Sequence, residues 1–163
     1  MDEVRMAMND IRRAYYPSKI GLLEITGTDR EILSMNFVIK KKPAGSTLSP
    51  VLKTCIRELD EYFHGKRRVF SVRLRLEGTD FQKKVWRELL KVGYGKTASY
   101  QEIANAVGRP KAVRAVGNTN RLNPVSIIVP CHRVIGSDGK LVGYGGGLWR
   151  KEWLLKHERG QTK

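Results

Sequence analysis

Cys131 and His132 are neighbouring residues whose types could carry out covalent chemistry, and they directly follow a proline and the apolar residues 125–129. Cysteine reacts as its thiolate, so a nucleophilic cysteine needs a base or a positive environment that lowers its pKa. His132 and Arg133 could provide that environment, and Glu158 is a candidate for the third group that would orient the histidine. The spacing alone leaves two interpretations open: a nucleophile with its base, or a structural cysteine beside a surface histidine.

Residues 143–147 form a glycine-rich run that could serve a flat ligand, because glycine lets a backbone approach closely. Tyr144 is the one residue of this run that is not glycine. The alternative interpretation is a flexible loop ahead of the last helix.

The composition favours an anionic partner. The chain has 163 residues, 40% hydrophobic and 29% charged, so it can bury a core and is not a disordered polycation. Its net charge of +15 favours nucleic acid, ribosomal RNA or an anionic membrane surface, and disfavours an acidic-tailed chaperone or a cation buffer. Residues 79–163 hold 16 basic and 6 acidic side chains, against 15 and 10 in residues 1–78. The ligand is therefore expected on the C-terminal half, unless this charge is only a solvated surface.

The two cysteines, Cys55 and Cys131, are too few for a disulfide framework or a four-cysteine zinc site. Cys55 lies on the apolar stripe of a predicted helix and is interpreted as a buried core thiol. No metal and no cofactor is predicted. The chain has no run of 18 apolar residues and no basic segment followed by an apolar one at its start. We expect a soluble protein of a reducing compartment, the cytoplasm or, in a eukaryote, the nucleus.

The first half reads as a small α/β unit. Its first 18 residues are ambiguous between a strand and a frayed helix. Alternation and periodicity then predict strands at residues 22–26, 32–38 and 70–76, and a helix from Ser49 and Pro50 to Gly65. Glu77 and Gly78 mark the boundary, which predicts domains at residues 1–77 and 78–163.

The second half reads as helical. Capping-box patterns begin helices at Thr79 and at Ser99, and a third helix is expected to start at Arg109 and Pro110. The second and third helices, separated by a glycine-containing turn, predict a helix-turn-helix. A buried strand is predicted at residues 125–129, and a last helix at residues 148–158.

The string Pro130-Cys131-His132-Arg133-Val134, preceded by Asn123-Pro124, resembles the active-site signature of the O6-alkylguanine-DNA alkyltransferases. The resemblance runs from Phe81 to Glu158, and the N-terminal half matches only in its strand–helix–strand pattern. It includes Ser99-Tyr100, Arg114-Ala115-Val116-Gly117, Gly143-Tyr144, residues 151–155 and His157-Glu158. The resemblance implies an α/β protein with a small ribonuclease H-like N-terminal domain and a C-terminal winged helix-turn-helix-type domain.

The resemblance implies DNA repair by direct reversal, with no metal and no cofactor. Cys131 would take an alkyl group from O6 of guanine, and less readily from O4 of thymine, in one irreversible and stoichiometric step. His132 would act as a base through a water molecule, with Glu158 orienting it. Tyr100 would press on the target phosphate, and its hydroxyl could protonate the leaving guanine.

The resemblance also implies how DNA is bound. Arg114 would enter the duplex from the minor groove and fill the gap left by the flipped nucleotide, and Asn123 would tie this helix to the active-site strand. The partner would be double-stranded DNA carrying O6-alkylguanine, bound by a monomer without a membrane. The further DNA-contacting residues are Lys111 and Ala115, and the pocket residues are Val134, Tyr144, Gly145, Gly146 and Lys151.

Two features separate this chain from parts of the family. Some members carry a serine where Gly145 stands, so a backbone N–H would have to replace a side-chain hydrogen bond to O6. A related group has tryptophan at the cysteine position and only binds lesions, and Cys131 argues against that group.

Two other function classes compete. A non-catalytic winged-helix transcription regulator accounts for the charge and the helix pair, but not for Cys131, His132 or the glycine run. A cysteine hydrolase accounts for the nucleophile, but it would turn over many substrate molecules and needs no basic helix pair.

Overall fold

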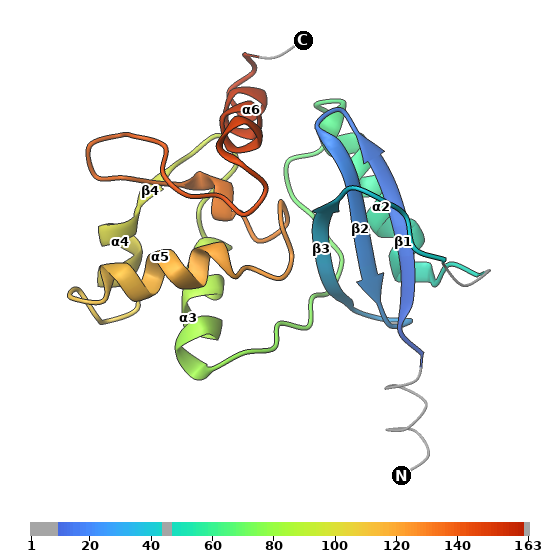
Figure 1. Ribbon diagram of the computed structural model, residues 1–163, viewed down its shortest axis with the longest axis horizontal. Coiled ribbons are helices and arrows are strands. Elements are labelled where there is room, and N and C mark those ends of the chain that lie inside the picture. The colour runs from blue at the N-terminus through green and yellow to red at the C-terminus, as the bar shows by residue number, and fades with distance from the viewer. Residues whose placement is uncertain (1–9, 44–46, 162–163) are drawn as a thin grey trace. The chain divides into compact units, whose positions relative to one another are not determined.

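The computed structural model describes residues 10–43 and 47–161. The chain divides into two compact units between Arg75 and Leu76 (Figure 1), two residues before the boundary predicted from the sequence. Each unit has elements of its own, and we describe them in turn as unit 1 and unit 2.

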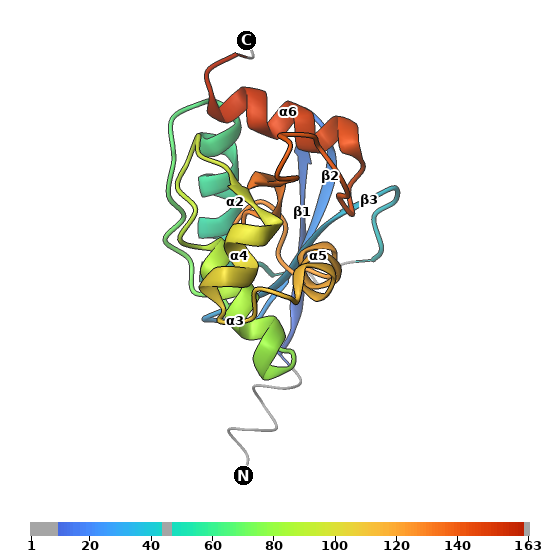
Figure 2. The same cartoon turned by 90° about the vertical axis from the view of Figure 1, so that its left-hand side faces the viewer.

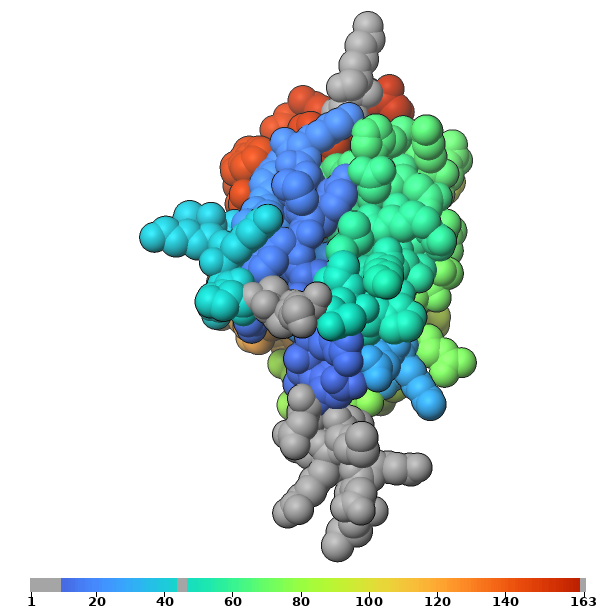
Figure 3. Space-filling model, turned by 90° about the vertical axis from the view of Figure 1, so that its right-hand side faces the viewer, coloured from blue at the N-terminus to red at the C-terminus, as the bar shows by residue number. Residues whose placement is uncertain are grey.

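Unit 1 is a three-stranded antiparallel sheet packed against one helix. The strands are β1 (Arg12–Ser18), β2 (Gly21–Gly27) and β3 (Ile32–Val38), in the order β1-β2-β3, and the helix is α2 (Pro50–Phe63). Alternate strand residues point to opposite faces. The buried set on the sheet includes Ala14, Leu23, Ile25 and Met35, and α2 contributes Leu52, Cys55 and Leu59. Both β1 and α2 also reach the surface of unit 1 (Figure 3).

The structure settles one ambiguity in unit 1 and corrects one prediction. Residues 12–18 are a strand, whereas residues 1–9 lie outside the described part. The predicted strand at residues 70–76 is wrong, because only a single parallel bridge joins Leu74 to Ile32. The backbone N–H of Ser71 donates to the Glu58 carboxylate instead of to a strand. Exposure does alternate from Phe70 to Leu74, but the backbone N–H of Ser71 pairs with a side chain and not with a neighbouring strand.

Unit 2 is mainly helical. Its helices are α3 (Asp80–Leu89), α4 (Tyr100–Ala106), α5 (Val113–Arg121) and α6 (Leu148–Glu158). The predicted capping box forms at Thr79, and Ser99 caps α4 through the Glu102 N–H. Helices α4 and α5 lie side by side (Figures 1 and 2), as the helix-turn-helix prediction requires. Two short strands, β4 (Ala98–Ser99) and β5 (Val134–Ile135), pair in parallel.

Two predictions in unit 2 need correction. Helix α5 begins at Val113, because residues 109–112 form a turn closed by the bond from the Ala112 N–H to the Arg109 carbonyl. Residues 125–129 are buried as predicted but turn instead of forming a strand. Ile127 in this turn has a φ of 72°.

Asn123 explains this turn, because it binds both ends. Its Oδ1 accepts from the Val125 N–H at 2.9 Å and its Nδ2 donates to the Val129 carbonyl at 2.7 Å. The side chain therefore holds residues 125–129 in the conformation that delivers Cys131 to the interior.

Candidate active site

Cys131 opens a single 3-10 turn, Cys131–Arg133, and its side chain is 5% exposed. Burial raises the pKa of the thiol to about 11, although the Asn123 amide, the Lys151 ammonium group and nearby backbone N–H groups partly oppose the rise. Neither the imidazole of His132 nor the guanidinium of Arg133 is among the groups that oppose this rise. The thiol is protonated at neutral pH, so a base must remove its proton before it can act as a nucleophile.

Arg133 does not serve the thiol because its guanidinium is bound elsewhere. Its Nε and Nη2 donate to the two carboxylate oxygens of Glu158 at 2.7 and 3.0 Å, and its Nη1 donates to the Val92 carbonyl at 2.6 Å. Burial alone would raise the pKa of Glu158, but His132 and Arg133 hold it well below its ordinary value. The carboxylate is therefore ionised and held in a fixed orientation.

His132 is completely buried, and its Nε2 lies 2.7 Å from Oε2 of Glu158. Burial lowers the pKa of the imidazole, and Glu158 offsets this only in part, so the ring is neutral at pH 7. Because an ionised carboxylate only accepts, Nε2 carries the proton and Nδ1 keeps its lone pair. Nδ1 is buried and has no hydrogen-bond partner among the residues that the structure describes. A neutral imidazole with a free acceptor nitrogen can serve as a general base.

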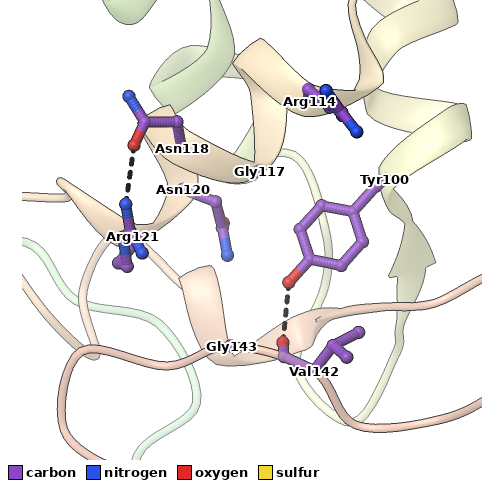
Figure 4. A pocket seen from close by; sticks show the side chains of 8 residues that line it. All are labelled: Tyr100, Arg114, Gly117, Asn118, Asn120, Arg121, Val142 and Gly143. Carbon is purple, nitrogen blue, oxygen red and sulfur yellow. Dashed lines mark hydrogen bonds between the residues drawn. The ribbon is translucent and has the colours of Figure 1, made fainter.

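A cavity of about 320 Å³ lies between α4, α5 and the loop before the glycine-rich run (Figure 4). The Tyr100 hydroxyl closes one side by donating to the Val142 carbonyl at 2.8 Å. Burial raises the pKa of Tyr100, and a hydrogen bond from the Asn120 amide partly opposes this rise. The wall is formed by Tyr100, Arg114, Gly117, Asn118, Asn120, Arg121, Val142 and Gly143.

The predicted pocket residues are not in the wall of this cavity. Lys151 is completely buried. Burial raises the pKa of Tyr144, and both side chains lie near enough to Cys131 for a thiolate there to act on them. The Lys151 ammonium group donates to the Val142 and Gly143 carbonyls at 2.8 and 3.2 Å, and burial lowers its pKa to about 8. The three remaining predicted residues also lie outside the wall: Val134, Gly145 and Gly146.

The loop leaves space where some family members carry a serine. A Cβ added at Gly145 would lie 3.6 Å from the Arg121 carbonyl oxygen, which is an ordinary contact. The absence of a side chain at this position is therefore not forced by packing.

The predicted DNA-contacting residues lie together at the start of α5. Arg114 and Ala115 are exposed in its first turn, and Lys111 is exposed just before it. Figure 4 shows Arg114 and Tyr100 projecting from different helices on the same side of the cavity.

Sequence reasoning missed Asn120 and Arg121, which both line the cavity. Asn120 lies on the inward face of α5 with Val116 and Thr119, at helical spacing. A polar amide at an inward position was the available signal, because buried polar groups are uncommon without a partner. Arg121 carried no signal beyond its charge.

Comparisons with known proteins identify the family. Residues 11–76 match the model described as 6-O-methylguanine DNA methyltransferase, ribonuclease-like domain, and residues 80–160 match the model described as its DNA binding domain. The chain belongs to this family. The matches confirm the resemblance inferred from the active-site string and the predicted α/β class with its two kinds of domain.

Named relatives and solved structures of the same family also match this chain. A methylated-DNA–protein-cysteine methyltransferase of Methanosarcina barkeri is 45% identical over 151 residues, 90% of this chain and 96% of the relative. The crystal structure of the Mycobacterium tuberculosis O6-methylguanine methyltransferase matches with a TM-score of 0.84 at 40% identity, over 94% and 95% of the two chains. A structure of the M. tuberculosis OGT in complex with DNA matches with a TM-score of 0.81 at 43% identity, over 93% of each chain.

Within residues 10–43 and 47–161, no group of three or more His, Cys, Asp or Glu side chains could hold a metal ion. None of the helices in the same ranges is long and apolar enough to span a membrane.

Proposed function

We propose that this chain repairs double-stranded DNA by direct reversal, moving an alkyl group from O6 of guanine, and less readily from O4 of thymine, to Cys131. The observation that carries the proposal is the buried series Cys131, His132 and Glu158, in which the imidazole is neutral and its Nδ1 has no partner within residues 10–43 and 47–161. Family membership supports the same reaction and does not support a non-catalytic regulator.

The reaction follows from this arrangement. His132 Nδ1 takes the thiol proton through a water molecule, while Glu158 holds the ring and stabilises the imidazolium. The thiolate sulfur attacks the alkyl carbon, so a carbon–sulfur bond forms as the bond from carbon to O6 breaks. Guanine leaves with the bonding electrons and takes a proton from the Tyr100 hydroxyl, and the proton that the imidazolium received from the thiol then replaces it on Tyr100 through solvent. A soft thiolate attacks saturated carbon without the help of a metal.

Lys151 and Asn123 act on the thiolate. Lys151 places a positive charge near the sulfur, and the Asn123 amide is within hydrogen-bonding reach of it. Burial lowers the pKa of Lys151 to about 8, and a thiolate at Cys131 partly opposes this fall. The ammonium and thiolate forms therefore stabilise each other once the base has removed the thiol proton.

DNA binding uses the surface at the start of α5. Arg114, Ala115 and Lys111 are exposed there and would contact the minor groove. The target base must leave the stack because O6 is paired inside the duplex, and Arg114 would occupy the vacated space. We expect the protein to act as a monomer in the cytoplasm, or in the nucleus of a eukaryote, where DNA is found and thiols stay reduced.

The test is a titration of excess O6-methylguanine duplex against a fixed amount of protein. The methyl count should reach a plateau near one per chain, with the added mass on Cys131, because water cannot displace the thioether. Methyl release that continues beyond one per chain would favour the cysteine hydrolase. Binding without any transfer would favour the regulator.

A further inference from the structure

Arg133 shares the Glu158 carboxylate with His132. Its Nε and the backbone N–H of Gly95 donate to Oε1 of Glu158, at 2.7 and 3.3 Å. Its Nη2 and the Nε2 of His132 lie 3.0 and 2.7 Å from Oε2. The guanidinium is itself fixed by its bond to the Val92 carbonyl. The carboxylate that orients the imidazole therefore also contacts a cation through both of its oxygens.

The net charge of this cluster depends on the form of the imidazole. With a neutral ring, the charges of Arg133 and Glu158 cancel. With an imidazolium, the three side chains carry an uncompensated positive charge. His132 is completely buried, and Arg133 and Glu158 are 7% and 6% exposed, so that charge would have little contact with water. An uncompensated buried charge is costly, and the cluster therefore disfavours the imidazolium in the resting protein.

The other groups around His132 do not reverse this balance. Burial lowers the pKa of His132, Glu158 opposes this, and the charges of Arg133 and Lys151 act in the same direction as burial. Lys151 on α6 therefore adds to the effect of Arg133. Three further titratable side chains near this turn are neutral at pH 7 because burial raises the pKa of each: Cys131, Tyr100 and Tyr144.

We propose that Arg133 is a positioning residue that keeps the resting site in its neutral thiol and imidazole form, so that Cys131 stays unreactive toward electrophiles other than a bound lesion. The inference rests on the proposed function, because it concerns the same base and nucleophile. Arg133 is not among the groups that act directly on the thiol, so its effect passes through Glu158 and His132. A protein that transfers a single alkyl group loses that capacity when its sulfur reacts with anything else.

Removal of the guanidinium should reverse the charge balance. In Arg133→Met, a neutral imidazole leaves the Glu158 carboxylate without a compensating charge, and an imidazolium cancels it. The imidazolium then places a positive charge next to Cys131 and favours the thiolate. The resting form should therefore change from thiol and imidazole to thiolate and imidazolium.

The first experiment detects the thiolate in protein without DNA. A thiolate absorbs ultraviolet light at wavelengths where a thiol does not, and Cys131→Ser supplies the blank. The unmodified protein should show no Cys131 thiolate from pH 6 to 8, whereas Arg133→Met should show it throughout. Thiolate absorbance from Cys131 in the unmodified protein at pH 7 would overturn the proposal without any variant.

The second experiment measures the alkylation of Cys131 by iodoacetamide, with the label located by peptide mass. In the unmodified protein the rate should rise about tenfold for each pH unit from 6 to 8, because only the thiolate reacts and the thiol has a pKa of about 11. In Arg133→Met the rate at pH 7 should be at least about tenfold higher and nearly independent of pH. A folded Arg133→Met with the wild-type rate and slope would show that the guanidinium does not control the thiol.

Two further variants separate the charge of Arg133 from its packing. Arg133→Lys keeps a positive charge and should retain the wild-type absorbance and slope. A lysine variant that behaves like Arg133→Met would contradict the role of the charge. Arg133→Gln keeps an N–H donor for Glu158 without the charge, and it replaces the methionine variant if that variant does not fold.

The matched control lies in unit 1. Arg67 forms an ion pair with the buried Glu58 at 2.9 Å, so Arg67→Met removes a similar partner from a carboxylate that holds no imidazole. It should leave the absorbance and the labelling rate of Cys131 unchanged. Neither readout needs methyl transfer. A lack of transfer from an O6-methylguanine duplex to the unmodified protein would therefore count against the proposed function and not against the state of the thiol.

Discussion

Each of the two units buries one cysteine and one glutamate, but their surroundings differ. In unit 1, burial raises the pKa of Cys55 to about 12, and the charge of Glu58 acts in the same direction. In unit 2, burial also raises the pKa of Cys131, but an amide, an ammonium group and N–H groups oppose it. Burial of the thiol is therefore shared by the core cysteine and the active-site cysteine. The active site differs because groups around its cysteine stabilise the thiolate.

The two buried glutamates show the same contrast. Glu58 accepts from Arg67 at 2.9 Å and from the backbone and hydroxyl of Ser71, and all three donors hold one chain segment in place. Glu158 is held by Arg133 in a similar way, but it also holds His132, whose Nδ1 has no partner in the described part of the chain. A buried ion pair can support chemistry when it also holds a reactive side chain in place and leaves one nitrogen of that side chain available to accept a proton.

Serine at the two cysteine positions should give the largest difference. Cys131→Ser should transfer no methyl group, because a serine alkoxide is scarcely populated at neutral pH, yet it should still bind the duplex. Cys55→Ser should keep one methyl per chain but lose roughly 1–3 kcal/mol of unfolding free energy from burying a hydroxyl. Methyl titration and urea denaturation measure the two effects. Transfer by Cys131→Ser would sink the assignment of the nucleophile.

Glutamine at the two glutamate positions should give the next largest effect. Glu158→Gln should slow methyl transfer about 100-fold or more, because the imidazolium loses its stabilising charge. Glu58→Gln should leave the transfer rate within about twofold and cost roughly 1–3 kcal/mol of stability, since Arg67 then keeps only its ion pair with Glu61. Single-turnover kinetics measures the transfer rate of both variants, and urea denaturation measures their unfolding free energy. Equal slowing in the two would remove the distinction drawn between the carboxylates.

The pH dependence of stability should reveal the buried thiol. The pKa of Cys131 is raised from 9.0 to about 11 on folding, so its contribution to stability is fully present below pH 9 and is lost as the pH rises toward 11. The unfolding free energy of the wild type minus that of Cys131→Ala should therefore fall by roughly 2–3 kcal/mol over this interval. Denaturation with reductant from pH 7 to 11 measures it. A flat difference would mean that the thiol is not desolvated.

The sequence was most informative where local chemistry decides structure. Thr79 and Ser99 begin helices as their capping patterns predict, since a side-chain oxygen satisfies a free backbone N–H at that point. The string around Cys131 predicted the family, and Glu158, the candidate for the group that orients His132, lies 2.7 Å from its Nε2.

The secondary-structure predictions were wrong where a side chain from elsewhere in the sequence hydrogen-bonds to backbone groups of the segment. Glu58 binds the N–H of Ser71 and prevents a regular strand, and Asn123 bends residues 125–129 into a turn. No local pattern shows either interaction. The sequence also did not show that the Arg133 guanidinium points away from Cys131. Side chains of neighbouring residues need not point toward one another.

Methylation of Cys131 should give the smallest change in unfolding free energy. It compares the two thiols through their reactivity, without a substitution at either position. The added methyl group enters a region where Cys131 is 5% exposed and Val134 is completely buried, so it must displace packed atoms. Overpacking of this kind costs roughly 1–3 kcal/mol. The protein should be treated with methylated duplex, freed of DNA and unfolded in urea beside an untreated sample. Cys131→Ser taken through the same treatment should show no change, because Cys55 is completely buried and its thiol is the less acidic of the two. A methylated protein as stable as the untreated one would mean that the pocket around Cys131 has room for the product, and the packing ascribed to this site would be wrong.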